Sequence, residues 1–235
     1  MPANESVAAP FPAATVVLLR DRASGPEVLM IERVRRGSFA GFWVFPGGRV
    51  DPEDRDPADA DEIATARRAA AREAVEETSL IVDPADLVVH SHWMPPPIEE
   101  KRFSTWFFVG RAPDGDVLLH EKEATRHEWF RPGDAIDAHA AGSLSLAPPT
   151  WMTLRSLMTG VTVDEVLGGI DQQRPGIFHT RALQATPMVL AWRGDVGYDS
   201  ADPADPANGA FDLHTPGPRN RLFLAPGGWR YEISA

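Results

Sequence analysis

The stretch that decides the fold is residues 46–80, which read PGGRVDPEDRDPADADEIATARRAAAREAVEETSL. Its most informative part is Arg72-Glu73-Ala74-Val75-Glu76-Glu77, in which three glutamates stand at positions i, i+3 and i+4. On an α-helix these positions lie within a sector of about 100°. Like charges at such a short separation repel one another unless solvent or a cation intervenes. A solvated acidic helix face is one interpretation of the pattern, and a divalent-cation site is the other.

The pattern around this acidic cluster is helical from about Glu62 to Thr78. Alanine recurs every fourth residue, at positions 66, 70 and 74, which gives a thin face that can lie close to a sheet. We expect Val75 and Leu80 to broaden that face. The carboxylates lie largely away from it, so the pattern predicts an acidic site where a helix meets a sheet.

Apolar runs on both sides of the helix predict strands at 15–19, 28–31, 87–92, 104–109, 116–120 and 129–132. Strands interleaved with one strong helix indicate the α/β class, with a mixed sheet. After Pro148-Pro149 the character changes: 151–158 and 163–167 are predicted helices, and 188–192 and 221–224 are predicted strands. An exposed loop is expected at 199–218, which is rich in Asp, Pro, Gly and Asn.

The glycine pair and the acidic helix together resemble the Nudix box. Gly48 takes the leading glycine, residues 72–77 take the centre, and Leu80 takes the closing apolar position. Asp54 stands where the family has its first Glu, and seventeen residues separate it from Arg72 in place of seven. A surface loop can absorb the insertion at little cost. Ser79 replaces the closing Gly, a modest penalty at a left-handed helix end.

The resemblance implies a Nudix-type α/β/α sandwich with a mixed sheet over residues 12–144. Residues 145–235 would form a C-terminal helical and strand extension packed on that core. The implied reaction is hydrolysis of a diphosphate bond in a nucleoside diphosphate linked to another group. The implied cofactor is Mg²⁺ or Mn²⁺, because these ions suit carboxylate oxygens and substrate phosphates. Its ligands would be Glu73, Glu76 and Glu77.

Further site residues follow from the same resemblance. Arg72 would orient the glutamates by ion pairing. We expect Gly47 and Gly48 to form a sharp turn beside the helix and to contact substrate, with one carbonyl available to the metal. Asp54 either pairs with Arg72 or is an ordinary loop acid.

Residues outside the box complete the candidate site. Glu121 and Glu123 are both candidates for the general base, of which we favour Glu123, and a solvated charge in Glu-Lys-Glu is the alternative. Lys101 and Arg102 precede an apolar strand and could meet substrate phosphates; a strand-end charge pair is the competing explanation. Histidines at 90, 92, 120 and 127 have no metal-ligand spacing, so we interpret them as structural or incidental.

The substrate class is narrowed by residues around the box. Val28–Arg33 and Trp43–Gly48, with an insertion inside the box, resemble the branch that cleaves coenzyme A and acyl-CoA. A histidine that members of this branch carry before the box has no counterpart between Arg36 and Phe45. An ADP-ribose or dinucleotide diphosphatase is the alternative, and a non-catalytic nucleotide-sensing module is a third hypothesis. The complete Arg-Glu and Glu-Glu centre favours an enzyme.

Composition limits the partners. The net charge of −11 argues against a nucleic-acid or anionic-membrane binder, but bound cations can still bring in a phosphorylated small molecule. The chain has no cysteine and no apolar run of membrane-spanning length. With no secretory pattern in residues 1–12, we expect a cytoplasmic protein. A homodimer is compatible with the chain.

Overall fold

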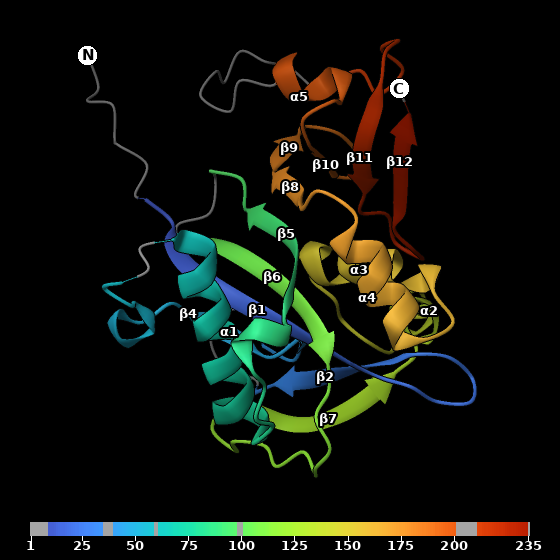
Figure 1. Ribbon diagram of the computed structural model, residues 1–235. Coiled ribbons are helices and arrows are strands. Elements are labelled where there is room, and N and C mark those ends of the chain that lie inside the picture. The colour runs from blue at the N-terminus through green and yellow to red at the C-terminus, as the bar shows by residue number, and fades with distance from the viewer. Residues whose placement is uncertain (1–8, 35–39, 59–60, 98–100, 201–210, 235) are drawn as a thin grey trace. The chain divides into compact units, whose positions relative to one another are not determined.

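The computed structural model describes residues 9–34, 40–58, 61–97, 101–200 and 211–234. The described chain divides into two compact units (Figure 1). The core unit consists of residues 12–92 and 105–176, and the second unit consists of the other described residues. Strands and helices are interspersed along the chain, which confirms the predicted α/β class. None of the helices in the described ranges is both long and apolar enough to span a bilayer.

The elements from β1 to α4 make up the part of the chain that holds the Nudix box. They are β1 (Phe11–Arg20), β2 (Glu27–Arg33), β3 (Trp43–Val44), β4 (Gly47–Arg49), α1 (Glu62–Thr78), β5 (Val88–Met94), β6 (Phe103–Arg111), β7 (Ala124–Phe130), α2 (Pro132–Ala140), α3 (Pro148–Ser156) and α4 (Val163–Asp171). Short 3₁₀ helices lie at Pro52–Asp54, Pro84–Asp86 and Leu157–Thr159.

The main sheet has the strand order β3-β2-β1-β6-β5-β8, where β8 is Gly176–His179; β4 also pairs with β1, and β7 with β2. Strand β1 is antiparallel to β2 and to β4. It is parallel to β6, because Phe11 N–H donates to Arg102 O near the start of both strands and Ala112 N–H donates to Leu19 O at their ends. The sheet is therefore mixed, as predicted.

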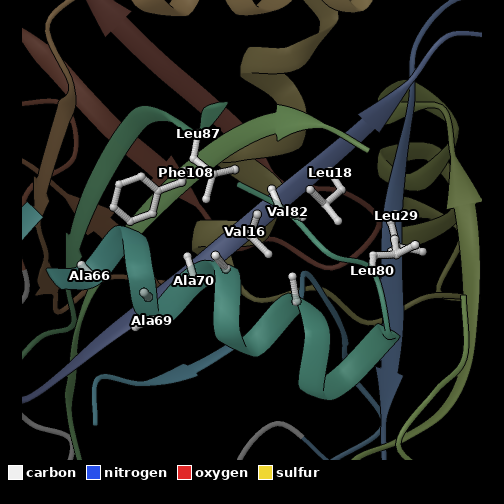
Figure 2. Close-up of a cluster of buried hydrophobic side chains, with 13 residues drawn as sticks. Val16, Leu18, Leu29, Ala66, Ala69, Ala70, Leu80, Val82, Leu87 and Phe108 are labelled. Carbon is white, nitrogen blue, oxygen red and sulfur yellow. The ribbon is translucent and has the colours of Figure 1, made fainter. Parts of the chain in front are cut away.

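Helix α1 packs on one face of this sheet through its alanines (Figure 2). The side chains that meet them come from β1, β2, β6 and the segment after the helix; they include Val16, Leu18, Leu29, Leu80 and Phe108. The thin alanine face is thus confirmed, as is the burial of Leu80. The prediction for Val75 was wrong: it is 41% exposed, because it lies on the side of α1 away from the sheet.

The opposite face of the sheet is also covered. Val17 and Leu19 alternate with the residues that face α1, and both are fully buried. Helices α2, α3 and α4 lie on that side of the sheet (Figure 1), and Trp151 and Leu154 of α3 are buried. Helices on both faces of a mixed sheet make the α/β/α sandwich that the resemblance implies.

Two local predictions were wrong. Residues 116–120 form no strand, because Leu118 and His120 donate their N–H groups to carbonyls at the end of α1. Gly47 and Gly48 form no sharp turn: they belong to β4, and neither has a left-handed φ. The strand predicted at 129–132 begins earlier, as β7, and ends where Pro132 opens α2.

The second unit contains a separate antiparallel sheet of order β12-β11-β10-β9. Its elements are β9 (Arg181–Leu183), β10 (Val189–Ala191), α5 (Val196–Ser200), β11 (Arg219–Phe223) and β12 (Arg230–Ser234). Strands β10 and β11 match the predicted strands at 188–192 and 221–224. Part of the predicted loop, residues 201–210, lies outside the described residues. The division of the chain at 144/145 stays a prediction.

Candidate active site

Strand β4 and helix α1 meet at two glycine–glutamate contacts. Gly47 N–H donates to Glu77 Oε2 at 2.8 Å. A Cβ atom added at Gly48 would lie 2.3 Å from Glu73 Oε1, so the Glu73 carboxylate occupies the space that a side chain would fill. At Gly47 an added Cβ would lie 2.5 Å from the Ala14 carbonyl oxygen on β1. Close approach of neighbours, and not a turn, explains why both residues are glycine.

Arg72 joins the carboxylates of the box into one network. Its Nε and Nη2 each donate to Asp54 at 3.0 Å, one to each carboxylate oxygen. Its Nη1 donates to Glu73 Oε1 at 3.0 Å and to Glu76 Oε2 at 2.9 Å. Nη2 also donates to the Arg49 carbonyl at 2.9 Å. Of the two alternatives for Asp54, the structure shows the ion pair, and its bidentate geometry fixes the guanidinium plane.

Glu73 and Glu77 are buried although each carries a carboxylate. Glu73 is 8% exposed and Glu77 is 2% exposed. Burial raises the pKa of Glu73, against the opposing effect of Arg72, and the charges of Glu76 and Glu123 raise it further. Burial also raises the pKa of Glu77 to about 8, opposed by the Gly47 hydrogen bond and reinforced by Glu123 and Glu73. Both shifts indicate negative charge that the protein alone compensates incompletely.

Glu123 lies close enough to Glu77 for its side chain to raise the pKa of the Glu77 carboxyl group. It stands at the end of a turn in which Glu123 N–H donates to His120 O at 2.9 Å, immediately before β7. The residue is exposed, in contrast to its buried neighbour. The fold therefore brings together Glu73, Glu77 and Glu123, which are up to 50 residues apart in the sequence.

Glu76 differs from its two neighbours on α1. Its side chain is 56% exposed and pairs with Arg72. The helix thus presents two buried carboxylates to β4 and a third to solvent. The ion pair with Arg72 fixes its position at the edge of the same network.

The candidate ligands are of the chemical type that hard divalent cations prefer. Every candidate ligand is a carboxylate oxygen, and the pKa values of Glu73 and Glu77 are raised mainly by burial and in part by neighbouring carboxylates, both of which a bound cation would offset. Within the described ranges, however, no group of three or more His, Asp or Glu side chains already has the arrangement of a metal site. Glu76 accepts a hydrogen bond from Arg72, and Glu77 accepts one from Gly47 N–H.

Lys101 and Arg102 belong to the second unit, just before β6. The Lys101 ammonium lies 5.9 Å from the ring centroid of Phe103, and the Arg102 carbonyl accepts from Phe11 N–H. Their contact with a substrate phosphate stays a prediction. His90 is structural as predicted, because both of its ring nitrogens lie 2.8 Å from serine hydroxyls.

Two contributors were missed in the sequence. One is the Arg49 carbonyl that accepts from Arg72, and the other is the main chain of residues 118–120 at the end of α1. Both act through backbone atoms, so no side-chain pattern signals them.

Comparison with known proteins places this site in a family. The NUDIX domain matches residues 9–148, which is more than half of the chain. The chain belongs to the NUDIX family. Its expected class, a Nudix-type hydrolase, is thereby confirmed. No curated protein gives a significant match.

One solved Nudix structure shares the fold, and others are less similar. A NUDIX hydrolase from Alicyclobacillus acidocaldarius is similar with a TM-score of 0.62 at 23% identity, covering 71% of this chain and 99% of that one. A MutT NUDIX hydrolase from Burkholderia pseudomallei has a TM-score of 0.49 at 20% identity, with coverage of 63% and 98%. The NUDIX domain of Shewanella oneidensis NrtR, solved with ADP ribose, has a TM-score of 0.48 at 15% identity, with coverage of 63% and 86%.

Proposed function

We propose that this Nudix protein is a divalent-metal-dependent diphosphatase acting on a nucleoside diphosphate linked to another group. The observation that carries the proposal is the burial of Glu73 and Glu77 against β4, with Glu123 beside them. Packing two carboxylates in this way is unfavourable for a merely structural site. A function that uses them with a cation accounts for their position.

Each residue has a defined task in this proposal. Glu73, Glu76 and Glu77 would hold Mg²⁺ or Mn²⁺, which when bound would neutralise the diphosphate and polarise its phosphoryl oxygens. Arg72 orients Glu73 and Glu76 through the bonds described above. Its own position is fixed by Asp54, so the helix needs no substrate to arrange its acidic face.

Glu123 is the proposed general base. Its exposure lets a water molecule reach the carboxylate, while its place beside Glu77 keeps it at the acidic centre. A carboxylate in hydrogen-bonding reach of the attacking water can accept its proton as the phosphorus–oxygen bond forms. Gly47 and Gly48 are proposed to contact the substrate through backbone atoms of β4, because Glu73 and the Ala14 carbonyl already fill the space beside their Cα atoms.

The proposed substrate is coenzyme A or an acyl-CoA, on the sequence resemblance around β2 and β3. Lys101 and Arg102 are the proposed contacts for phosphate groups of that substrate. Hydrolysis of ADP-ribose or a dinucleotide is the alternative, because the same acidic centre would serve any diphosphate. Sensing of a nucleotide without turnover is the non-catalytic alternative.

Incubation with a panel of diphosphates tests the proposal. The panel holds CoA, acetyl-CoA, ADP-ribose and a diadenosine polyphosphate, each with Mg²⁺, with Mn²⁺ or with EDTA, and products are identified by mass. We expect cleavage of the diphosphate bond with either metal and none with EDTA. Tight binding of a panel member without any product would favour the sensing alternative, and cleavage in EDTA would contradict the metal dependence.

A further inference from the structure

Residues 116–123, which we name the capping segment, cover the C-terminal end of α1. Leu118 N–H donates to Thr78 O at 3.0 Å, and His120 N–H donates to Glu77 O at 3.3 Å. The last carbonyl groups of a helix have no donor within the helix. The capping segment supplies these donors, which is why it adopts no strand of its own.

These contacts connect Glu77 and Glu123 through the backbone. Glu77 is held by its side chain, through Gly47, and by its carbonyl, through His120. The His120 carbonyl in turn accepts from Glu123 N–H at 2.9 Å and from Ala124 N–H at 3.2 Å. The backbone link between Glu77 and Glu123 therefore consists of the hydrogen bond from His120 to Glu77 and the turn from His120 to Glu123. A shift of the capping segment along the helix end would move Glu123 relative to Glu77.

Ser79 lies between the helix and the capping segment. It is the C-cap residue of α1 and has left-handed backbone angles, φ 62° and ψ 10°. This conformation is unfavourable for a residue that has a Cβ atom, and the Nudix pattern has glycine here. The Ser79 hydroxyl donates to the Leu118 carbonyl at 3.3 Å. The chain thus retains a strained residue that adds a link to the capping segment.

We propose that Ser79 is a positioning residue whose hydroxyl fixes the capping segment on α1 and so holds Glu123 against Glu77. The inference rests on the proposed function, in which both glutamates belong to the catalytic site. Glycine at position 79 would relieve the strain and release the segment. Stability and turnover should therefore change in opposite directions.

Three variants separate the effect of the Ser79–Leu118 hydrogen bond, the link, from the effect of the left-handed backbone, the strain. Ser79→Gly removes both, Ser79→Ala removes the link and keeps the strain, and Ser79→Asn tolerates the left-handed conformation while offering a side-chain donor. With the diphosphate that the protein cleaves, we expect Ser79→Gly to unfold at higher urea concentration yet to lower kcat roughly three- to tenfold, with KM within about twofold. Ser79→Ala should lose kcat similarly, and Ser79→Asn should restore it. Unchanged kcat in Ser79→Gly would overturn the inference.

Amide hydrogen exchange tests the same link without activity. Exchange of the Leu118 and His120 amides reports opening of the capping segment. We expect it to be roughly three- to tenfold faster in Ser79→Gly and close to wild type in Ser79→Asn. Wild-type exchange in Ser79→Gly would overturn the inference even if diphosphatase activity is found. Faster exchange in a protein that cleaves no diphosphate would support the link and count against the proposed function alone.

Discussion

A methyl group at Gly48 would meet the end of a flexible side chain, whereas one at Gly47 would meet backbone. In Gly48→Ala the Glu73 carboxylate must move to make room for the Cβ atom, but the strand need not. We expect the free energy of unfolding to change by less than about 1 kcal/mol, because the alanine also restricts the unfolded chain. Turnover should fall by at least about tenfold, since Glu73 leaves its place. Urea unfolding and steady-state kinetics measure the two effects.

Two other glycines provide controls for Gly48→Ala. Gly47→Ala brings its Cβ against the Ala14 carbonyl, so it should lower stability by roughly 1–3 kcal/mol. Gly168→Ala, in α4, has open space around the new methyl group and should stabilise the protein by up to about 1 kcal/mol without changing turnover. A Gly48→Ala protein that is fully active would contradict the placement of Glu73 in the site.

Replacing Glu77 by Gln separates charge from shape. The Gln carbonyl oxygen can still accept from Gly47 N–H, while the repulsion from Glu73 and Glu123 is removed. We expect turnover at saturating Mg²⁺ to fall by at least about a hundredfold, because a ligand carboxylate is lost. Stability of the metal-free protein at pH 8 should be unchanged or higher.

Glu76→Gln is the matched comparison on the exposed side of the same helix. It removes an ion pair with Arg72 and no buried charge, so its stability should change little. We expect its turnover to fall as well, since Glu76 is a proposed ligand. Near-wild-type activity in Glu77→Gln at saturating metal would remove Glu77 from the metal site.

At the scale of elements, His90 connects β5 to α3. Ser156 Oγ donates to the Thr153 carbonyl at 2.7 Å, so it accepts a hydrogen bond from His90 Nε2 at 2.8 Å. The other ring nitrogen lies 2.8 Å from Ser91 Oγ, and in the neutral imidazole it accepts a hydrogen bond from that hydroxyl. Burial lowers the pKa of His90 to about 4.

This shift predicts a loss of stability in mild acid. The unfolded chain, in which His has its ordinary pKa of about 6.5, takes up the proton before the folded protein does. The contribution of His90 is therefore full above about pH 6.5 and decreases toward pH 4. Its slope is about 1.4 kcal/mol per pH unit between the two pKa values. Urea unfolding of the wild type and of His90→Asn at pH 7, 6 and 5 should show the steeper loss in the wild type.

Equal pH slopes for the two proteins would contradict the assignment of His90. NMR titration gives an independent control, since the His90 imidazole should stay neutral at pH 5.5. An imidazole that titrates near pH 6.5 would mean that β5 and α3 leave the ring accessible to water.

The elements differ in how far local sequence determines them. Helix α1 was predicted with its observed bounds, because Asp61 at its N-cap, the alanine periodicity and the left-handed Ser79 all act locally. The 116–120 segment was misassigned, since its hydrogen bonds go to Glu77 and Thr78, about forty residues earlier. An apolar alternation cannot reveal that a helix end needs donors.

The same distinction applies to the candidate site. The spacing of residues 72–77 predicted one acidic helix face, and the helix geometry explains why. The pairing of Asp54 with Arg72 stayed open in the sequence because an inserted loop separates them. Glu123 could be named from the family resemblance, but its contact with Glu77 depends on how β7 and the capping segment are placed. Contacts between residues far apart in the sequence are thus the part of the site that local sequence patterns do not predict.

At the scale of the whole molecule, the chain combines a core unit with a second unit. The core unit holds the Nudix box and Glu123, whereas Lys101 and Arg102 belong to the second unit. The second unit has its own internal contacts, including a buried ion pair of Arg221 with Asp195 at 2.6 Å. The residues proposed to hold the metal and to act as the general base all lie in the core unit. The second unit should therefore be tested for an effect on substrate choice.

Arg102→Ala tests that division with CoA and dephospho-CoA. CoA carries a 3′-phosphate that dephospho-CoA lacks, and an arginine can hold a phosphate through two parallel hydrogen bonds, each worth about 1.5–3 kcal/mol. If Arg102 binds the 3′-phosphate, Arg102→Ala should lower kcat/KM for CoA by at least about tenfold. The kcat/KM for dephospho-CoA should change much less. Lys101→Ala, beside it, should show a smaller difference, because lysine binds phosphate as a point charge. Equal losses on both compounds would mean that Arg102 contacts the shared diphosphate or supports the fold, and cleavage of ADP-ribose but neither CoA compound would favour the alternative substrate.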